Sequence, residues 1–530
     1  MFDYIIIGGS VLDGSGQPGI VADVAIRDGR VAAVGALAEA ESRSTVDATG
    51  HIVAPGFIDI HSHSDFTLLV DGRAESQLAQ GVTTEVVGNC GHGCAPFTNT
   101  PLMRTNIYGY APDLTIDWDS VDGYLSRLQG ARPAVNVATL VPNGNLRIAA
   151  LESTDRPATR AEVNRMATLL REGLSEGAFG FSTGLEYPVE RHASAEELLA
   201  LCRVTAQEDK LYATHTRNRD VQAVEAIQEA IDVARQSGAR LEISHLIPRR
   251  AGNDKVWEEA LAVVDRAQSQ GLDLTFDSHT RLHGITNLST ALPPSEANLP
   301  AVQLRNRLLD RSARQSMRSY PSIISSFGLG GWERVTLFSS KATPDKVGIN
   351  FKDLADGGDP MDVVYDILAA NAADPHSVMV TCHTHDEGWL RGTFSHPLCM
   401  PGSDATALCT TGPLASSSFL GAYTWAGWYL RRIVRECKDL SLEEGIRRLT
   451  AMPAERVGLK QRGRLAPDYW ADIVIFNADE VADQGTLQTP NLLASGVRDV
   501  FVNGVKAMND GVFTEARTGR VIRSGHSSNG

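Results

Sequence analysis

The stretch of sequence that decides the fold reads Ala54-Pro55-Gly56-Phe57-Ile58-Asp59-Ile60-His61-Ser62-His63. Before it, short β-rich runs alternate with turn signals such as Asp28-Gly29, which predicts a small antiparallel sheet. After it, strands of the buried type alternate with helical segments, as in a parallel sheet covered by helices. The stretch therefore marks the boundary between two architectures.

Eight strand candidates follow from this boundary onward. They are residues 57–60, 83–87, 135–140, 179–182, 211–214, 241–244, 272–276 and 399–403. Between most of them lie segments whose apolar residues recur at three and four positions, such as residues 161–176 and 220–237, which predicts amphipathic helices. Eight such units predict an α/β fold, a TIM-like (β/α)₈ barrel.

The two ends of the chain are expected to share a second, smaller domain. The last part of the chain turns β-rich again at residues 471–476 and 500–505, and these runs can pair with the N-terminal sheet. We therefore expect residues 1–56 and 448–530 to form a small β-sandwich domain around a barrel of residues 57–447. About a hundred residues separate the last two barrel strands, and we expect this insertion, at about 280–377, to form helices over the barrel mouth.

The composition excludes several classes of protein. The chain has 530 residues, 42% of them hydrophobic, and a net charge of -15, which argues against nucleic-acid binding because phosphates require a basic surface. Seven scattered cysteines indicate reduced thiols. The first residues do not resemble a signal peptide, and no run approaches the roughly 20 apolar residues that cross a bilayer. We expect a cytoplasmic protein without membrane partners.

Residues that bind metals fall at five of the eight strand ends. The five segments are Ile60-His61-Ser62-His63, Gly88-Asn89-Cys90-Gly91, Thr214-His215-Thr216-Arg217, Ser244-His245-Leu246 and Gly402-Ser403-Asp404-Ala405. Active sites of (β/α)₈ barrels lie at the C-terminal ends of the strands. Residues two apart in an extended chain project to the same face, so that His61 and His63 can reach one ion. The pattern predicts a metal centre at the mouth of the barrel.

Each of these residues also has an ordinary structural explanation. A single histidine at a strand end is more often a hydrogen-bonding or solvent-facing residue, and a buried cysteine such as Cys90 is commonly a small hydrophobic residue. Asp404 could cap a helix. Independent structural residues have no reason to gather at the same end of one barrel, and this coincidence favours the metal centre.

The sequence also resembles a known family. Residues 54–63 resemble the signature of the amidohydrolase superfamily, and more specific segments resemble the D-aminoacylase (N-acyl-D-amino-acid deacylase) group. Those segments are Gly88-Asn89-Cys90-Gly91 with Ala95-Pro96, Phe181-Ser182-Thr183-Gly184-Leu185-Glu186-Tyr187, Thr214-His215-Thr216-Arg217-Asn218, Gly402-Ser403-Asp404 and, in the tail, residues 460–465 before Ala471-Asp472. In this group a cysteine takes the place of the carboxylated lysine of hydantoinases and dihydroorotases. The resemblance runs from end to end.

The resemblance implies a role for each residue of the metal centre. It implies that Cys90, His215 and His245 hold a tightly bound Zn²⁺, that His61, His63 and Asp404 surround a second, weaker position, and that Asp404 is the catalytic base. Thiolate and imidazole suit zinc, which lowers the pKa of bound water from about 15.7 toward about 7. We therefore expect a metal-activated water to attack an amide carbonyl, with Asp404 passing the water proton to the departing nitrogen.

The region that recognises substrate departs from the family pattern. The family typically has a lysine where this chain has Ile247, a Tyr-Pro-Tyr-like run where this chain has Phe276-Asp277-Ser278-His279, and a His-Pro-Arg where this chain has residues 412–418. Tyr187 is retained. Arg249 or Arg250 could replace a lost cation, because a guanidinium can bind a carboxylate bidentately, although surface arginines of a loop explain them equally well. The candidate substrate-binding residues are Tyr187, Arg249, Arg250 and Ser278.

Three functional hypotheses follow. The leading one is a metal-dependent hydrolase that cleaves the amide bond of an N-acyl-D-amino acid or a related N-acylated small molecule. The altered substrate region keeps a second one open, an amidohydrolase of a neutral or aromatic amide or of a cyclic amide. The third is a barrel that binds without catalysis, which would require missing ligands. Homo-oligomer formation is left open. His279, His283, His383 and His385 add imidazoles, and for His383 and His385 we expect a hydrogen-bonding or lid role rather than a third metal position.

Overall fold

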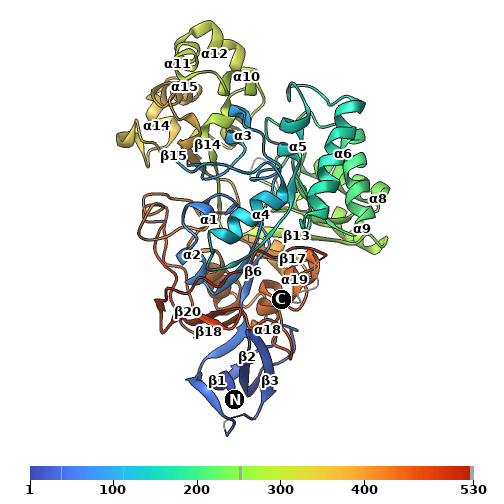
Figure 1. The fold of residues 1–530 in the computed structure, drawn as a ribbon. Helices are drawn as coiled ribbons and strands as arrows, with labels where there is room; N and C mark the ends of the chain where they lie inside the picture. The colour runs from blue at the N-terminus through green and yellow to red at the C-terminus, as the bar shows by residue number, and fades with distance from the viewer. Residues whose placement is uncertain (38, 112, 250–253, 526–530) are drawn as a thin grey trace.

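The computed structural model describes residues 1–37, 39–111, 113–249 and 254–525 (Figure 1). Its centre is a ring of parallel strands. They are β6 (Phe57–Asp59), β7 (Val82–Val87), β8 (Asn136–Thr139) continued by β9 (Val141–Pro142), β10 (Gly180–Gly184), β11 (Leu211–His215), β12 (Arg240–Ile243), β13 (Leu274–His279) and β17 (Cys399–Gly402). The pairing runs β6-β7-β8 and β9-β10-β11-β12-β13-β17, and a parallel bridge between Ser62 and Ala405 joins the last strand to the first. All eight predicted strands lie at strands of this ring.

Helices cover the outside of the barrel. They include α4 (Val121–Gly130), α5 (Asn143–Ala150), α6 (Arg160–Ser175), α7 (Ala195–Gln207), α8 (Ala223–Ser237), α9 (Asp254–Ser269), α16 (Glu387–Ser395), α18 (Leu442–Leu449) and α19 (Ala451–Val457), with the short helices α1 (Thr67–Val70), α2 (Glu75–Leu78), α3 (Pro101–Thr105) and α17 (Trp425–Trp428) in connections. In α8 the buried positions Ile227, Ile231 and Ala234 recur at three and four residues. Full burial of each isoleucine contributes about 1.5–3 kcal/mol.

Local signals set the ends of these helices. Thr159 and Glu162 form a capping box at the start of α6, and α8 ends at Gly238, whose φ of 79° lies in the left-handed region. Such caps satisfy backbone groups that have no partner within the helix. The strand-helix rhythm of the barrel therefore follows from local sequence as well as from packing.

Strands from both chain ends form one nine-stranded sheet. They are β1 (Phe2–Val11), β2 (Ile20–Arg27), β3 (Arg30–Gly35), β4 (Ser42–Asp47), β5 (Ile52–Pro55), β18 (Ile473–Phe476), β19 (Val497–Val502), β20 (Val505–Asn509) and β21 (Val512–Phe513). The two halves meet where β5 pairs antiparallel with β18. Side chains from both halves share an apolar core, in which the rings of Tyr4 and Phe501 meet edge to face with centroids 5.2 Å apart. In Figure 1 this sheet lies at the bottom, below the barrel.

The long connection between β13 and β17 forms a separate lobe with its own core. Its helices are α10 (Pro294–Ala297), α11 (Ala301–Leu309), α12 (Arg311–Arg318), α13 (Ile323–Leu329), α14 (Phe351–Ala355) and α15 (Pro360–Ala370). It also contains an antiparallel sheet of β14 (His283–Asn287), β16 (Met379–His383) and β15 (Val335–Ser339), in that order. Figure 1 shows the lobe at the top, at the far end from the nine-stranded sheet. The expectation of helices alone was incomplete, because it missed this sheet.

Two further sequence expectations concern the whole chain. All seven cysteines carry free thiols, as expected. Among the described residues, no helix combines the length and the apolar character that a membrane crossing requires.

Candidate metal centre

The polar residues predicted at the strand ends gather at one mouth of the barrel. His61 and His63 follow β6, Cys90 follows β7, His215 ends β11, His245 follows β12 and Asp404 follows β17. The five histidine and cysteine side chains are at most 3% exposed. Because parallel strands of a barrel end on the same side, residues distant in sequence come together here.

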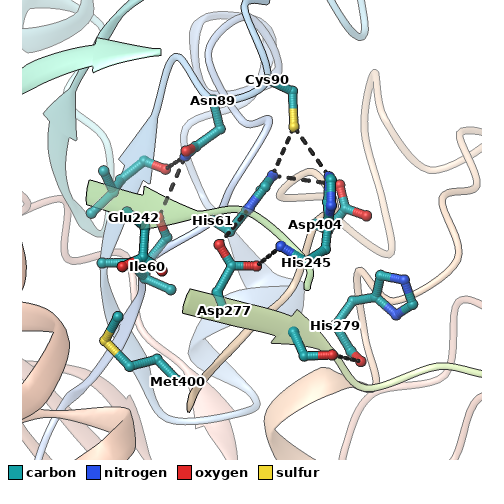
Figure 2. Close-up of polar contacts among 12 residues, drawn as sticks. Ile60, His61, Asn89, Cys90, Glu242, His245, Asp277, His279, Met400 and Asp404 are labelled. Carbon is teal, nitrogen blue, oxygen red and sulfur yellow. Dashed lines mark hydrogen bonds and ion pairs between the residues drawn. The ribbon is translucent and has the colours of Figure 1, made fainter. Parts of the chain in front are cut away.

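Four of these side chains approach closely enough to share one ion (Figure 2). The ligand atoms of His61, Cys90, His245 and Asp404 all lie within 4.8 Å of one another. Sγ of Cys90 lies 3.2 Å from Nε2 of His61 and 3.4 Å from Nε2 of His245, and Nε2 of His61 lies 3.7 Å from Oδ1 of Asp404. Ligands bonded to zinc at roughly 2.0–2.3 Å in a tetrahedron lie roughly 3.5 Å apart. The observed spacing fits such a centre.

The backbone of this cluster is held in an uncommon conformation. Cys90, His245 and Asp404 have φ angles of 54°, 38° and 44°, in the left-handed region that residues other than glycine seldom adopt. Such strain persists only where surrounding structure enforces it, and it concentrates at functional sites. Three of the four clustered residues carry it.

Two of the imidazoles are each in contact with a carboxylate through one ring nitrogen. Nδ1 of His61 lies 2.9 Å from Oδ2 of Asp277, whose other oxygen accepts the backbone N–H of His245 at 2.7 Å. Nε2 of His215 lies 2.9 Å from Oε2 of Glu186. Metal-binding histidines commonly donate their second ring N–H to a carboxylate in this way, which fixes the ring and the tautomer.

His215 and His63 lie beside the group of four. The ring of His215 lies 4.5 Å from that of His245 by centroid, and its Nδ1 is buried without a hydrogen-bond partner among the described residues. Nε2 of His63 lies 3.3 Å from Oδ1 of Asp404. The six predicted ligands thus form a group of four with one histidine on each side.

The protonation of these groups suits a soft divalent ion. Burial raises the pKa of the Cys90 thiol to about 11 and lowers the pKa of His215 to about 4 and that of His245 well below its usual value. The imidazoles of His215 and His245 are therefore neutral and able to coordinate, whereas the Cys90 thiol must lose its proton when an ion binds. A thiolate with imidazoles and a carboxylate selects zinc over magnesium or calcium.

Asp404 is additionally held by Arg281, which the sequence did not single out. Nη2 of Arg281 lies 2.6 Å from Oδ2 of Asp404, and Nη1 donates to the carbonyl of Ser403. Burial alone would raise the pKa of Asp404, but the Arg281 guanidinium and the hydrogen bond to His63 outweigh it and hold the pKa well below its usual range. The carboxylate is ionised at neutral pH and keeps Oδ1 toward the histidines.

The predicted substrate-binding residues have different surroundings. Tyr187 lines the pocket in front of the cluster. Arg249 also lines it, but its guanidinium forms ion pairs with Glu186 and Asp220. Ser278 is buried in β13 and its hydroxyl donates to the carbonyl of His279 at 3.4 Å. Arg250 lies outside the described residues.

Several pocket residues were not anticipated from the sequence as substrate-binding residues. Tyr108 and Phe419 come from connections, Arg219 follows β11, and Ile285 and Phe327 come from the inserted lobe. His92 lies behind Tyr108 and Tyr187, with ring centroids at 5.0 and 4.4 Å. The position of Arg219, four residues after His215, could have indicated that it lies at the site. The other residues come from segments that contain no motif.

Comparisons with known proteins agree with this architecture. A family model described as the amidohydrolase family matches residues 44–298 and 370–506, and the stretch between these two segments lies in the inserted lobe. The chain is 32% identical over 532 residues to the N-acyl-D-glutamate deacylase of Alcaligenes xylosoxydans xylosoxydans, covering 98% of this chain and 96% of that protein. It is 30% identical to the D-aminoacylase of the same organism, with 98% and 97% covered.

A solved structure extends the likeness to three dimensions. The crystal structure of N-acyl-D-glutamate deacylase from Bordetella bronchiseptica, complexed with zinc and a phosphonate inhibitor that mimics the tetrahedral intermediate, matches with a TM-score of 0.80 and 31% identity. The match covers 99% of this chain and 100% of that chain. The predicted fold class and the predicted resemblance are confirmed.

Proposed function

Because the chain belongs to the amidohydrolase family, in its N-acyl-D-amino-acid deacylase group, we propose that it hydrolyses the amide bond of N-acyl-D-amino acids or related N-acylated small molecules with the help of bound zinc. The observation that carries this proposal is the group of four ligand atoms within 4.8 Å at the mouth of the barrel. The reaction breaks the bond between the acyl carbon and nitrogen and adds water, which yields a carboxylic acid and an amine.

We assign the ligands as the family resemblance implies, and the unpartnered Nδ1 of His215 supports its part in that assignment. Cys90 and His245 offer Sγ and Nε2, and His215 offers Nδ1 because its Nε2 is engaged by Glu186. These three would hold the tight ion. His61, His63 and Asp404 would border a second, weaker position next to it. When bound, zinc supplies a nucleophilic water at neutral pH and polarises the scissile carbonyl.

Asp404 is proposed to move the proton. Its ionised carboxylate can accept a proton from the attacking water, and it can then donate that proton to the departing nitrogen. Arg281 fixes Oδ2 and thereby leaves Oδ1 toward the histidines. Tyr108, Tyr187 and Phe419 line the pocket in front of this carboxylate.

The test combines metal content with acyl release. Purified protein is expected to contain about one tightly held zinc per chain and to release acetate from N-acetyl-D-amino acids. Cys90→Ala is expected to lose both the zinc and the activity. Cys94→Ala is the matched control, because Cys94 is equally buried and is not part of the group of four. Wild-type protein without metal and without turnover would overturn the proposal.

Other properties stay predictions from the sequence. They are the cytoplasmic location, the absence of nucleic-acid partners and any homo-oligomeric state. The proposed substrate is a small molecule, which agrees with a pocket that the barrel mouth and the inserted lobe enclose together.

A further inference from the structure

Three arginines lie at or next to the pocket, and two of them are neutralised by carboxylates. Arg249 pairs with Glu186 and Asp220, and Arg281 pairs with Asp404. A buried guanidinium that already faces carboxylates gains little from an additional anion. Neither side chain is therefore suited to bind a charged substrate group.

Arg219 differs from both. It lines the pocket, yet within the described ranges no carboxylate forms an ion pair with it. Its Nη2 donates to two backbone carbonyls, those of His245 at 3.1 Å and Ile247 at 3.5 Å. Its Nε is buried and has no hydrogen-bond partner among the described residues. A partly buried cation without an anion is costly, and a ligand carboxylate would relieve that cost.

The position of Arg219 relates it directly to the metal centre. The guanidinium is hydrogen-bonded to the carbonyl of His245, whose ring belongs to the group of four. Figure 2 shows His245 next to Asp404 and close to His279. An anion bound by Arg219 would therefore lie beside the place where the scissile amide must sit.

Two more unpartnered polar atoms line the same pocket. Oγ1 of Thr286 and Nδ1 of His279 are buried and have no hydrogen-bond partner among the described residues. Both can donate a hydrogen bond, and buried donors are rarely left unsatisfied in the functional state of a protein. Thr286 comes from the inserted lobe and His279 from the barrel, so the donors approach from two sides.

From these observations we infer that Arg219 binds a carboxylate of the substrate, with Thr286 and His279 as further donors. This inference rests on the proposed function and narrows it to N-acyl amino acids that carry a free carboxylate. Neutral and aromatic amides are expected to be poor substrates, because they would leave the partly buried guanidinium of Arg219 without a counter-charge. The chain thus supplies a cation from the segment after β11, although it lacks the lysine after His245 and the arginine after Asp404 that the family pattern would provide.

The test compares substrates that differ in the presence and the position of a carboxylate. Acetate release is measured from N-acetyl-D-alanine, from its neutral carboxamide, and from N-acetyl-D-isoglutamine, which has a carboxylate on the side chain only. Arg219→Met is expected to lower kcat/KM for the carboxylate substrate by roughly 10- to 100-fold, mostly through KM, and to lower kcat/KM for the carboxamide much less. Arg219→Lys is expected to recover part of the loss. The third substrate shows whether the α-carboxylate or the side-chain carboxylate is bound.

A binding measurement makes the outcome independent of turnover. In an Asp404→Asn background, calorimetry with N-acetyl-D-alanine is expected to show weaker binding after Arg219→Met, with zinc content unchanged. Equal losses for charged and neutral substrates, or no loss for either, would overturn the role of Arg219. Zinc-dependent turnover restricted to neutral amides would overturn this inference and leave the hydrolase function intact, whereas no turnover of any amide would overturn the function itself.

Discussion

At the scale of single residues, Asp404 combines three contacts that suit a proton carrier. Its Oδ1 faces His63 and His61, its Oδ2 is fixed by Arg281, and its backbone has a positive φ. We expect Asp404→Asn to keep the side-chain shape and to lower kcat by roughly 10²- to 10⁴-fold, the usual contribution of a positioned acid or base. Stopped assays of acetate release, run together with elemental analysis, check this. A kcat near that of wild type at unchanged zinc content would show that another group carries the proton.

Glu186 is expected to support zinc binding through its contact with His215. It accepts the N–H of His215 and pairs with Arg249, and although burial alone would raise its pKa, these two partners lower it to about 2. Glu186→Gln is expected to weaken zinc binding by 10- to 100-fold, because the carboxylate behind a metal ligand fixes its ring and its tautomer. Competition with a chromophoric chelator measures the affinity.

Glu229→Gln serves as the control for that measurement. Glu229 also pairs with an arginine, Arg217, but at a partly exposed position away from the group of four. An equal loss of zinc affinity in both variants would mean that the effect of Glu186→Gln is a general loss of structure.

The sequence allowed the six candidate ligands to be named, but it could not reveal the residues that support them. Each ligand follows a recognisable strand, so the barrel pattern alone predicted that they would meet. Asp277 and Glu186 lie within quoted motifs, yet their contacts with His61 and His215 depend on side-chain directions. Arg281 reaches Asp404 over more than a hundred residues of chain, which no local pattern indicates.

At the scale of elements, the turn after β7 presents Cys90 to the site. Gly91 has a φ of 70°, and a Cβ there would lie 1.6 Å from Oε1 of Glu190 and 2.9 Å from the backbone N of Gly184. Gly91→Ala is therefore expected to lower the thermal midpoint and to reduce zinc content, because both the backbone and Glu190 must shift beside the thiol. Differential scanning fluorimetry and elemental analysis give the two readouts.

Gly130 offers a matched control for the glycine substitution. It is the last residue of α4, and a Cβ there would meet nothing within 4 Å. Gly130→Ala should leave the midpoint unchanged or raise it slightly, because alanine reduces the backbone freedom of the unfolded chain. If Gly91→Ala behaves in the same way, the turn tolerates a side chain and the geometric argument fails.

The barrel strands could be located from sequence, whereas the sheet of the inserted lobe could not. Barrel strands are buried runs followed by amphipathic helices, and both periodicities are visible locally. In the lobe, β14, β15 and β16 have five residues each, and β14 pairs with β16 over more than ninety residues of chain. Short strands paired across such a distance leave no periodic signal.

At the scale of the whole molecule, a buried polar cluster joins the barrel to the terminal sheet. Asp472, just before β18, accepts hydrogen bonds from Nδ2 of Asn136 in β8 and from the backbone N of Asn503 between β19 and β20. It also pairs with Arg462, and both side chains are nearly fully buried. The network therefore links three segments that lie far apart in sequence. Among the described ion pairs, only the carboxylate of Asp472 balances the charge of Arg462.

From this network we predict how a substitution of Asp472 changes the thermal stability of the protein. Asp472→Asn leaves Arg462 buried without a counter-charge and sets an amide N–H₂ among donors, which is expected to cost about 3–5 kcal/mol. The thermal midpoint should fall by several degrees, compared at one scan rate because a chain of this size can unfold irreversibly.

Asp468→Asn is the control, since Asp468 is exposed and asparagine tolerates its φ of 69°. The site residues do not touch Asp472, so zinc content at low temperature should be unchanged. A variant that keeps its midpoint would show that the apolar contacts between barrel and sheet suffice, whereas early loss of zinc during heating would show that the terminal sheet holds the barrel mouth in shape.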